Sequence, residues 1–214
     1  MTLLPQLLLT LAAILVGWGL DDVAGFVGEP ARVLLLAAVF LAYLAGVALG
    51  IDLNPFRKGE REGRGWPIIL GMLALPMAWA LTASYDRRGI FVWNGLSGLR
   101  YAEVAAFAAG ELVRLLALHD LGRQYSAFIT VQPDHSLIRH GIYRVIRHPF
   151  YLGQLLFTPS VPLAFRSPLA LFIFVSTVLF TLNRIRREEH FLVRHFDFYS
   201  AYRRQSWRLL PYLY

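Results

Sequence analysis

The stretch PFYLGQLLFTPSVPLAFRSPLALFIFVSTVLFTLN (residues 149–183) contains two apolar runs separated by a short polar turn at residues 166–168. The windows Pro149–Phe165 and Ser167–Asn183, the second of which includes part of the turn, are each 17 residues long. This length is at the short end of what crosses a hydrocarbon core of about 30 Å at about 1.5 Å per residue. Proline suits the first turn of a helix, so Pro168 marks the start of the second one. We therefore predict a tight helical hairpin whose two ends, His148 and Asn183, return to the same membrane surface.

Long apolar windows also occur before this hairpin. Of the 214 residues, 57% are hydrophobic and only 16% are charged, whereas soluble domains carry about a quarter charged residues. One of the windows is interrupted by charge, at Glu103, Glu111 and Arg114. The sequence predicts an all-α, polytopic integral membrane protein with about six transmembrane helices. The predicted spans are Met1–Leu20, Val33–Ile51, Gly65–Tyr85, Tyr101–His119, Pro149–Phe165 and Ser167–Asn183.

The basic residues indicate how these helices are oriented. With six spans, both ends of the chain lie on one side of the membrane, and fifteen basic residues then fall on that side against five on the other. This asymmetry predicts that the N- and C-termini are cytoplasmic. The arginines directly flank the spans, so membrane lipids with anionic headgroups are the expected partner of the +7 net charge, and nucleic acid is not.

The chain divides into two parts. Residues 1–119 hold the first four predicted helices, which we interpret as a transmembrane scaffold. Residues 120–214 begin with a polar segment, residues 120–148, that is too long for a simple helix connector and is therefore suspected of function. They end, after the hairpin, in a tail where Leu192, Phe196, Tyr199 and Arg203 follow at three- and four-residue spacing. That spacing predicts an amphipathic helix lying on the headgroup layer or capping the loop before the hairpin.

Two polar clusters stand at the ends of the hairpin. One is GIYRVIRHPFYLG (residues 141–153) and the other is RREEH (residues 186–190). Paired glutamates next to a hydrophobic span are costly unless they meet cations or water. A zwitterionic cofactor with a sulfonium group suits such a site. Carboxylates would bind its ammonium group, Arg or His would bind its carboxylate, and the face of Tyr151 would contact the sulfonium.

The motif Arg-His-Pro-x-Tyr-x-Gly (residues 147–153), followed by a hairpin and Glu188-Glu189, resembles the isoprenylcysteine carboxyl methyltransferase family and its phospholipid methyltransferase relatives. The resemblance covers roughly Leu121 to Pro211. One departure is Asp197, where the family often has glycine. The remaining matching segments are Leu121-Gly122-Arg123, Gly141-Ile142-Tyr143-Arg144, Tyr199-x-x-Tyr202 and Arg208-Leu-Leu-Pro211.

The resemblance implies a membrane methyltransferase that uses S-adenosylmethionine, releases S-adenosylhomocysteine and has a cofactor pocket facing the cytoplasm. The acceptor would be lipophilic, such as a prenylcysteine-type carboxylate, a lipid amine, a hydroxyl or a thiol. Arg147 and Glu189 would act catalytically near the acceptor, with Glu189 as the base if the acceptor is an amine or a phenol. The cofactor-binding residues implied by the resemblance are Gln132, His140, Tyr143, His148, Pro149, Tyr151, Asn183 and Glu188.

Simpler readings remain open beside these roles. His148 and Tyr151 also suit a membrane interface, and the two glutamates also suit pairs with arginines of their own helix. Glu111 and Arg114 are equally consistent with a structural pair and with a place in an acceptor tunnel. An NADPH-dependent membrane reductase of the sterol-reductase type is the alternative enzyme, and a lipid-binding or transport protein is the non-enzymatic alternative.

Metal and thiol chemistry are not expected. The six histidines offer no pair three or four residues apart, and the chain has no cysteine. Oligomeric state and the identity of the acceptor are not readable from the sequence.

Overall fold

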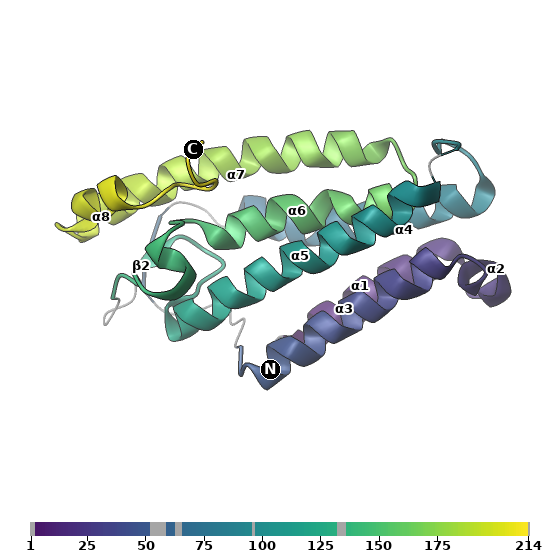
Figure 1. Cartoon of the computed structure of the whole chain (residues 1–214), viewed down its shortest axis with the longest axis horizontal. Coiled ribbons are helices and arrows are strands. Elements are labelled where there is room, and N and C mark those ends of the chain that lie inside the picture. Colours follow the sequence, from purple (N-terminus) through teal and green to yellow (C-terminus); the bar gives the residue numbers. More distant parts are fainter. Residues whose placement is uncertain (1–2, 52–58, 63–65, 96, 132–135, 214) are drawn as a thin grey trace.

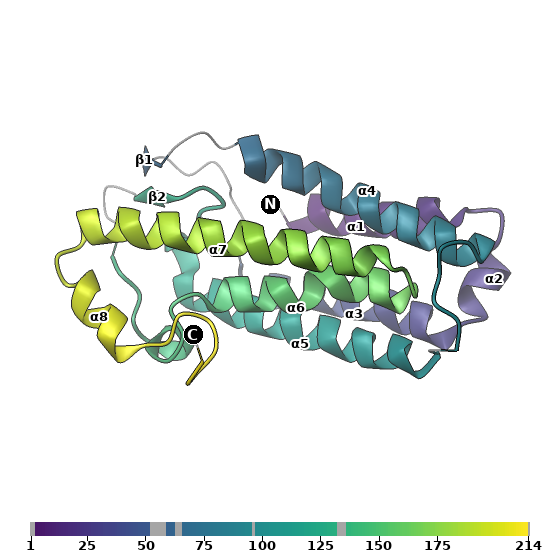
Figure 2. The same ribbon diagram turned by 90° about the horizontal axis from the view of Figure 1, so that it is seen from above.

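The computed structural model describes residues 3–51, 59–62, 66–95, 97–131 and 136–213. Long helices run side by side along the longest axis of the molecule, and the short elements lie at its two ends (Figures 1 and 2). The mainly helical fold that the sequence predicts is confirmed. The elements are α1 Leu3–Trp18, α2 Val23–Val27, α3 Pro30–Ala48, β1 Glu60–Arg61, α4 Trp66–Arg88, α5 Ser97–Leu121, η1 Gly122–Gln124, β2 Thr130–Val131, η2 Gly141–Arg144, α6 Pro149–Ala164, α7 Leu169–His195 and α8 Tyr199–Gln205.

In the described part of the chain, three helices are long and apolar enough to cross a membrane: α3, α4 and α7. The other three predicted spans form helices that differ from these in length or charge. α1 and α6 have 16 residues each, and α5 has 25 residues but contains Glu103, Glu111 and Arg114. The count of six transmembrane helices therefore stays a prediction.

α5 and α6 pack against each other through glycines. A Cβ on Gly153 would lie 2.5 Å from the carbonyl oxygen of Gly110, and a Cβ on Gly110 would lie 2.8 Å from that of Gly153. Small residues at a helix crossing let two backbones approach closely in a membrane protein. This contact explains physically why the motif at residues 147–153 ends in glycine. It also fixes the N-terminal part of α6, which follows the Arg-His pair of the motif, against α5.

We expect Gly153→Ala to lower the free energy of unfolding by about 1–3 kcal/mol, because the added methyl group forces the two helices apart. The matched control is Gly71→Ala in α4, where an added Cβ meets nothing within 4 Å; that substitution should be neutral or slightly stabilising. Unfolding of the purified variants with increasing SDS would measure both effects. Equal stabilities of the two variants would contradict the close contact.

One end of the bundle is held by a buried ion cluster. The side chain of Asp86, at the end of α4, is fully buried and accepts hydrogen bonds from Arg32 (2.9 Å), Arg100 (2.9 Å) and Arg166 (2.9 Å). These arginines belong to α3, to α5 and to the turn between α6 and α7, so a single carboxylate joins four parts of the fold. Three of the five basic residues that the sequence places on the outer side are thus used within the protein.

The other end carries the polar segments, and here the structure differs from the sequence-based expectation in two ways. Residues 120–148 contain a strand, β2, which pairs antiparallel with β1 from the loop between α3 and α4. The predicted amphipathic helix is not continuous, because α7 extends through Asn183 to His195 and ends where Phe196 adopts an extended backbone (φ −135°, ψ 105°). α8 then begins at Tyr199 and folds back next to the C-terminal end of α7 (Figure 2).

Candidate functional site

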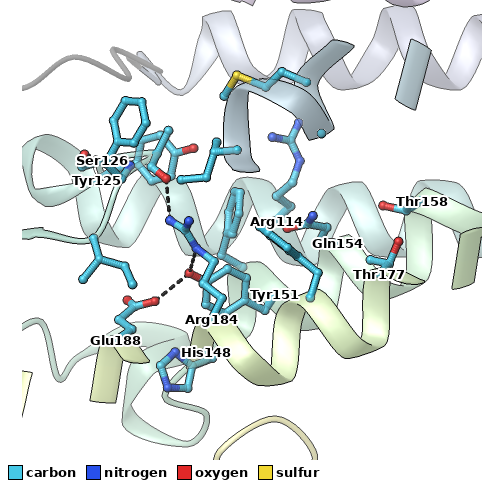
Figure 3. A pocket seen from close by; sticks show the side chains of 18 of the residues that line it. Arg114, Tyr125, Ser126, His148, Tyr151, Gln154, Thr158, Thr177, Arg184 and Glu188 are labelled. Carbon is cyan, nitrogen blue, oxygen red and sulfur yellow. Dashed lines mark hydrogen bonds between the residues drawn. The ribbon is translucent and has the colours of Figure 1, made fainter. Parts of the chain in front are cut away.

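A cavity of about 990 Å³ lies between α6 and α7 and extends to α1 and α4. Its polar end is lined by residues 124–130, by η2 and by the first turns of α6 (Figure 3). Its other end is apolar and is lined by side chains such as Leu9, Met72 and Phe172. Ligand pockets have volumes of about 300–1,000 Å³, so the cavity is large enough for a cofactor or for part of a cofactor and an acceptor.

Three side chains form a hydrogen-bonded chain at the polar end. The hydroxyl of Tyr151 donates to the carboxylate of Glu188 (2.6 Å), and Arg184 Nε donates to the same hydroxyl (2.5 Å). Arg184 Nη2 also donates to the carbonyl of Ala127 (2.5 Å), which ties the loop before η2 to α7 (Figure 3). Arg184 and Glu188 are four residues apart and so share one face of the helix. The polar end of the cavity thus presents a carboxylate, a guanidinium and an aromatic ring together.

A second cluster lies directly behind this one and holds the Arg-His pair of the motif. Glu189 is 3% exposed and is bound by Arg147 Nε (3.1 Å), His148 Nε2 (3.3 Å) and Arg208 Nη2 (2.8 Å). Arg147 additionally donates to the carbonyls of Arg203 (2.9 Å) and Ser206. Arg147 and His148 line the cavity, whereas Glu189 is not among the lining residues. The carboxylate therefore orients two side chains at the cavity wall.

Two tyrosines close the polar end from the side of η2 and α8. The hydroxyl of Tyr202 donates to the carbonyl of Tyr143 (2.6 Å), and both residues line the cavity. Burial raises the pKa of Tyr202 to about 12 and raises the pKa of Tyr143 well above its usual value. Both phenols therefore stay neutral at physiological pH, and Tyr202 keeps the proton with which it anchors η2.

The start of η2 depends on a glycine and a carboxylate. Asp120 accepts a hydrogen bond from the backbone N–H of Ile142 (2.9 Å). Gly141 has φ +56°, and a Cβ there would lie 1.9 Å from the carboxylate of Asp120. Glycine is the residue that adopts this backbone without strain. The Gly-Ile-Tyr-Arg segment is thereby placed next to the cavity.

The apolar part of the cavity contains a charged pair. Arg114 lines the cavity and binds Glu111 through Nη2 (2.7 Å) and Nε (3.0 Å). The sequence left open a structural pair and a place in an acceptor tunnel. The structure shows the pair, and Arg114 also lines the cavity. Gln154, three residues after Tyr151 on α6, lines the same region.

The structure brings together five of the site residues expected from the sequence and leaves others apart. Tyr143, Arg147, His148, Tyr151 and Glu188 line the cavity. Those outside the lining are His140 and Asn183, which are exposed, and Pro149 and Glu189, which are buried beside it. Gln132 lies outside the described residues.

Backbone geometry explains why Asn183 and His140 lie outside the cavity lining. Asn183 precedes Arg184 on a continuous helix, so its side chain points about 100° away from the cavity-facing one. His140 precedes the turn at Gly141, and its extended backbone (φ −109°, ψ 178°) leaves the side chain outside η2. The cofactor roles of Asn183, His140, Pro149 and Gln132 stay predictions.

Among the polar residues that line the cavity, sequence reasoning did not identify Gln124, Tyr125 and Arg184 as site residues. Arg184 had a usable signal, because it stands one helical turn before Glu188. Tyr125 and Gln124 lie in an irregular segment, where no periodicity relates them to α6 and α7. Gln124 is notable because its buried Oε1 has no hydrogen-bond partner among the described residues.

Comparison with known proteins shows which family the residues around this cavity resemble. A sequence model of the isoprenylcysteine carboxyl methyltransferase (ICMT) family matches residues 103–194, which include α5, the Arg-His-Pro motif, α6 and α7. Residues 103–194, about two fifths of the chain, are thus similar to the ICMT family. The resemblance inferred from the motif is confirmed.

Individual relatives show the same similarity. A probable protein-S-isoprenylcysteine O-methyltransferase of Oryza sativa subsp. indica is 33% identical over 123 residues, which is 53% of this chain and 61% of the relative. The chain therefore spans about three fifths of the length of this relative. A Delta(14)-sterol reductase of Methylotuvimicrobium alcaliphilum is 26% identical over 169 residues, covering 72% of this chain and 40% of the reductase.

A solved structure shows the same fold. The eukaryotic intramembrane Ras methyltransferase ICMT superimposes with a TM-score of 0.59 at 17% sequence identity, covering 94% of this chain and 73% of that protein. The shared architecture therefore extends over the N-terminal helices, outside the residues that the family model matches. Together with the apolar helices α3, α4 and α7, it identifies the chain as an integral membrane protein.

Proposed function

We propose that the protein transfers a methyl group from S-adenosylmethionine to a lipophilic acceptor, with the transfer site facing the cytoplasm. The observation that carries this proposal is the position of Glu188, Tyr151 and Arg184 at the polar end of a cavity whose other end is apolar. The polar end of the cavity suits a zwitterionic nucleotide, and the apolar end suits a lipophilic acceptor. The ICMT relatives support the same reading.

The residues at the polar end match the groups of S-adenosylmethionine. The carboxylate of Glu188 would bind the ammonium group, and Arg184 or His148 would bind the carboxylate. The faces of Tyr151 and Tyr125 would lie against the sulfonium cation. The Gln124 side-chain oxygen, which has no hydrogen-bond partner within the part of the chain that the structure describes, would accept from an amine such as the one on adenine.

The cofactor would supply an electrophilic methyl group, and the protein's own residues would supply binding, orientation and exclusion of water. Displacement at a sulfonium needs the acceptor atom in line with the methyl group, which is chiefly a matter of positioning. Arg114, held by Glu111, is a cation in the apolar part of the cavity and would orient an anionic acceptor such as a carboxylate. Glu189, held by four basic side chains, would act as a positioning residue for Arg147 and His148.

A membrane reductase using NADPH is the second candidate function, because a sterol reductase matches 72% of the chain. The two cofactors differ in charge. S-adenosylmethionine carries two cationic groups, whereas NADPH carries several phosphate charges and would place them near the carboxylate of Glu188. The cavity lining also holds Arg114, Arg147 and Arg184, which suit phosphate, so it is the similarity to the ICMT relatives that favours the sulfonium cofactor. Lipid binding or transport without chemistry remains the non-enzymatic alternative.

Two measurements test this proposal. The melting temperature of the purified protein should rise with S-adenosylhomocysteine and should not respond to NADPH. Incubation with methyl-labelled S-adenosylmethionine and a native lipid extract should label a lipid-soluble product, whose identification would name the acceptor. Stabilisation by NADPH alone would replace the proposal with the reductase function, and stabilisation by neither nucleotide would favour the non-enzymatic alternative.

A further inference from the structure

A short segment from the N-terminal half of the chain contacts the polar end of the cavity. β1, which lies in the loop between α3 and α4, pairs antiparallel with β2, and Figure 2 shows the pair next to the C-terminal half of α7. The backbone N–H of Glu62 also donates to the carbonyl of Ile129 (2.9 Å). Ile129 and Thr130 line the cavity, whereas residues 59–62 lie outside its lining. β1 therefore supports the cavity wall from the outside.

β1 and the wall approach each other closely. A Cβ on Gly59 would lie 2.4 Å from the carbonyl oxygen of Val131 and 2.8 Å from Cγ2 of Thr130. Glycine next to a strand is typical of such a close backbone approach. The guanidinium carbon of Arg61 lies 5.0 Å from the centre of the Phe128 ring, and Phe128 also lines the cavity. Backbone and side-chain contacts together thus hold β1 against the wall.

α7 holds β1 in place through two charged contacts. Arg187 Nε lies 3.5 Å from the carboxylate of Glu62, and His195 Nε2 lies 3.3 Å from the carboxylate of Glu60. A pair of two-residue strands is marginally stable on its own. The contacts with α7 therefore contribute to whether β1 stays against the wall.

The helix that holds β1 also carries a proposed cofactor residue, Glu188. Arg187 directly precedes Glu188, and Arg184 lies one turn before it and donates to the carbonyl of Ala127. The wall is thus tied to α7 at Ala127 by Arg184 and, further along, by the contacts of β1. These ties set the distance between the wall and Glu188, which is the space that the proposed cofactor would occupy.

We propose that β1 is a positioning element for the cofactor site, because it holds the wall formed by residues 124–131 at a fixed distance from α7. The loop between α3 and α4 would thereby raise the affinity for S-adenosylmethionine without touching it. This inference rests on the proposed function for the identity of the ligand. It gives the N-terminal half of the chain a role at the polar end of the cavity.

Charge reversal across the Arg187–Glu62 pair tests this role. Glu62→Arg and Arg187→Glu each replace an attraction by a repulsion, and the double variant restores opposite charges in reversed order. We expect each single variant to bind S-adenosylhomocysteine about fivefold more weakly than the wild type, and the double variant to bind within about twofold of it. Calorimetric titration of the purified proteins in lipid nanodiscs measures these affinities.

Arg204→Glu is the matched control. Arg204 is an exposed arginine of α8 at the same end of the molecule, and its reversal changes the net charge as much as Arg187→Glu does. Arg204 does not line the cavity. This variant should bind S-adenosylhomocysteine as the wild type does.

Gly59→Ala tests the same contact without changing any charge. The added methyl group would push β1 away from Val131, so the affinity for S-adenosylhomocysteine should again fall about fivefold. Two readouts separate positioning from general destabilisation. The midpoint of unfolding in SDS should match that of the wild type, because β1 lies outside the helix bundle. KM for S-adenosylmethionine should rise, whereas kcat at saturating cofactor should stay the same, because β1 touches no reacting group.

Hydrogen exchange of the ligand-free protein gives a result that does not depend on the cofactor. Peptides covering residues 124–131 should exchange faster in Gly59→Ala and in both single reversals, and at the wild-type rate in the double variant. Unchanged exchange and wild-type affinity in these three variants, or a double variant as impaired as the single ones, would overturn the role of β1. The expected exchange pattern in a wild-type protein that binds no S-adenosylhomocysteine would support β1 as a support of the wall and refute the methyltransferase proposal instead.

Discussion

Glu188→Gln should weaken binding of S-adenosylhomocysteine at least 100-fold, and Glu188→Ala should abolish it. Glutamine keeps an oxygen that can accept the Tyr151 hydrogen bond (2.6 Å in the wild type) but has no charge for an ammonium group. Truncating one partner of a buried, hydrogen-bonded charge pair costs about 2–5 kcal/mol of binding free energy. Calorimetric titration of the purified variants measures the change directly.

Asp197→Asn is the control for this experiment. Asp197 is an exposed carboxylate at the same end of the molecule, and its removal changes the net charge by the same amount. Binding by this variant should equal that of the wild type. Full-strength binding by Glu188→Gln would refute a cationic partner for Glu188, and an equal loss in both variants would indicate a long-range charge effect instead.

Asp86→Asn should strongly destabilise the fold. The substitution leaves Arg32, Arg100 and Arg166 without their common carboxylate, and Arg32 and Arg100 are only 9% and 2% exposed. Removing one member of a buried ion pair typically costs about 3–5 kcal/mol, and here three pairs are lost together. We expect little folded protein to be recovered after membrane extraction, and a lower midpoint of unfolding in SDS for what remains.

Asp21→Asn provides the comparison. The side chain of Asp21 is 73% exposed, although it binds Arg87 at 2.5 Å. Exposed ion pairs contribute little to stability, so this variant should unfold at the same SDS concentration as the wild type. If Asp86→Asn behaves the same way, the buried cluster does not hold the ends of the four elements together.

The sequence was informative where one physical rule dominates. Apolar windows predicted both ends of five of the six long helices to within a few residues, because a membrane selects for continuous apolar length. For α7 they predicted the start but not the end, which lies twelve residues beyond Asn183 at His195. Contacts made by long-range pairing were not predictable. The β1–β2 pair joins residue 60 to residue 131, and Asp86 contacts Arg32 and Arg166, which are 54 and 80 residues away in the chain. No local pattern encodes either contact.

The site was predictable to the extent that residues belong to helices with known ends. The site residues that the sequence identified lie where α6 begins and in the C-terminal part of α7. The short connection between these two helices therefore brings them together: Arg147, His148, Tyr151 and Glu188. Gln124 and Tyr125 come from an irregular segment, and their position depends on the strand pair and on Arg184 holding the carbonyl of Ala127. The roles of all these residues await measurement.

The central claim, that residues 124–125, 143–151 and 184–188 surround one S-adenosylmethionine, is tested most directly by photolabelling. Ultraviolet irradiation of the purified protein with radiolabelled S-adenosylmethionine, followed by protease digestion and mass spectrometry, would locate the label. We predict label on peptides from these three segments, competed away by S-adenosylhomocysteine and absent in Glu188→Ala. Label confined to other segments, or label competed by NADPH instead, would contradict the account.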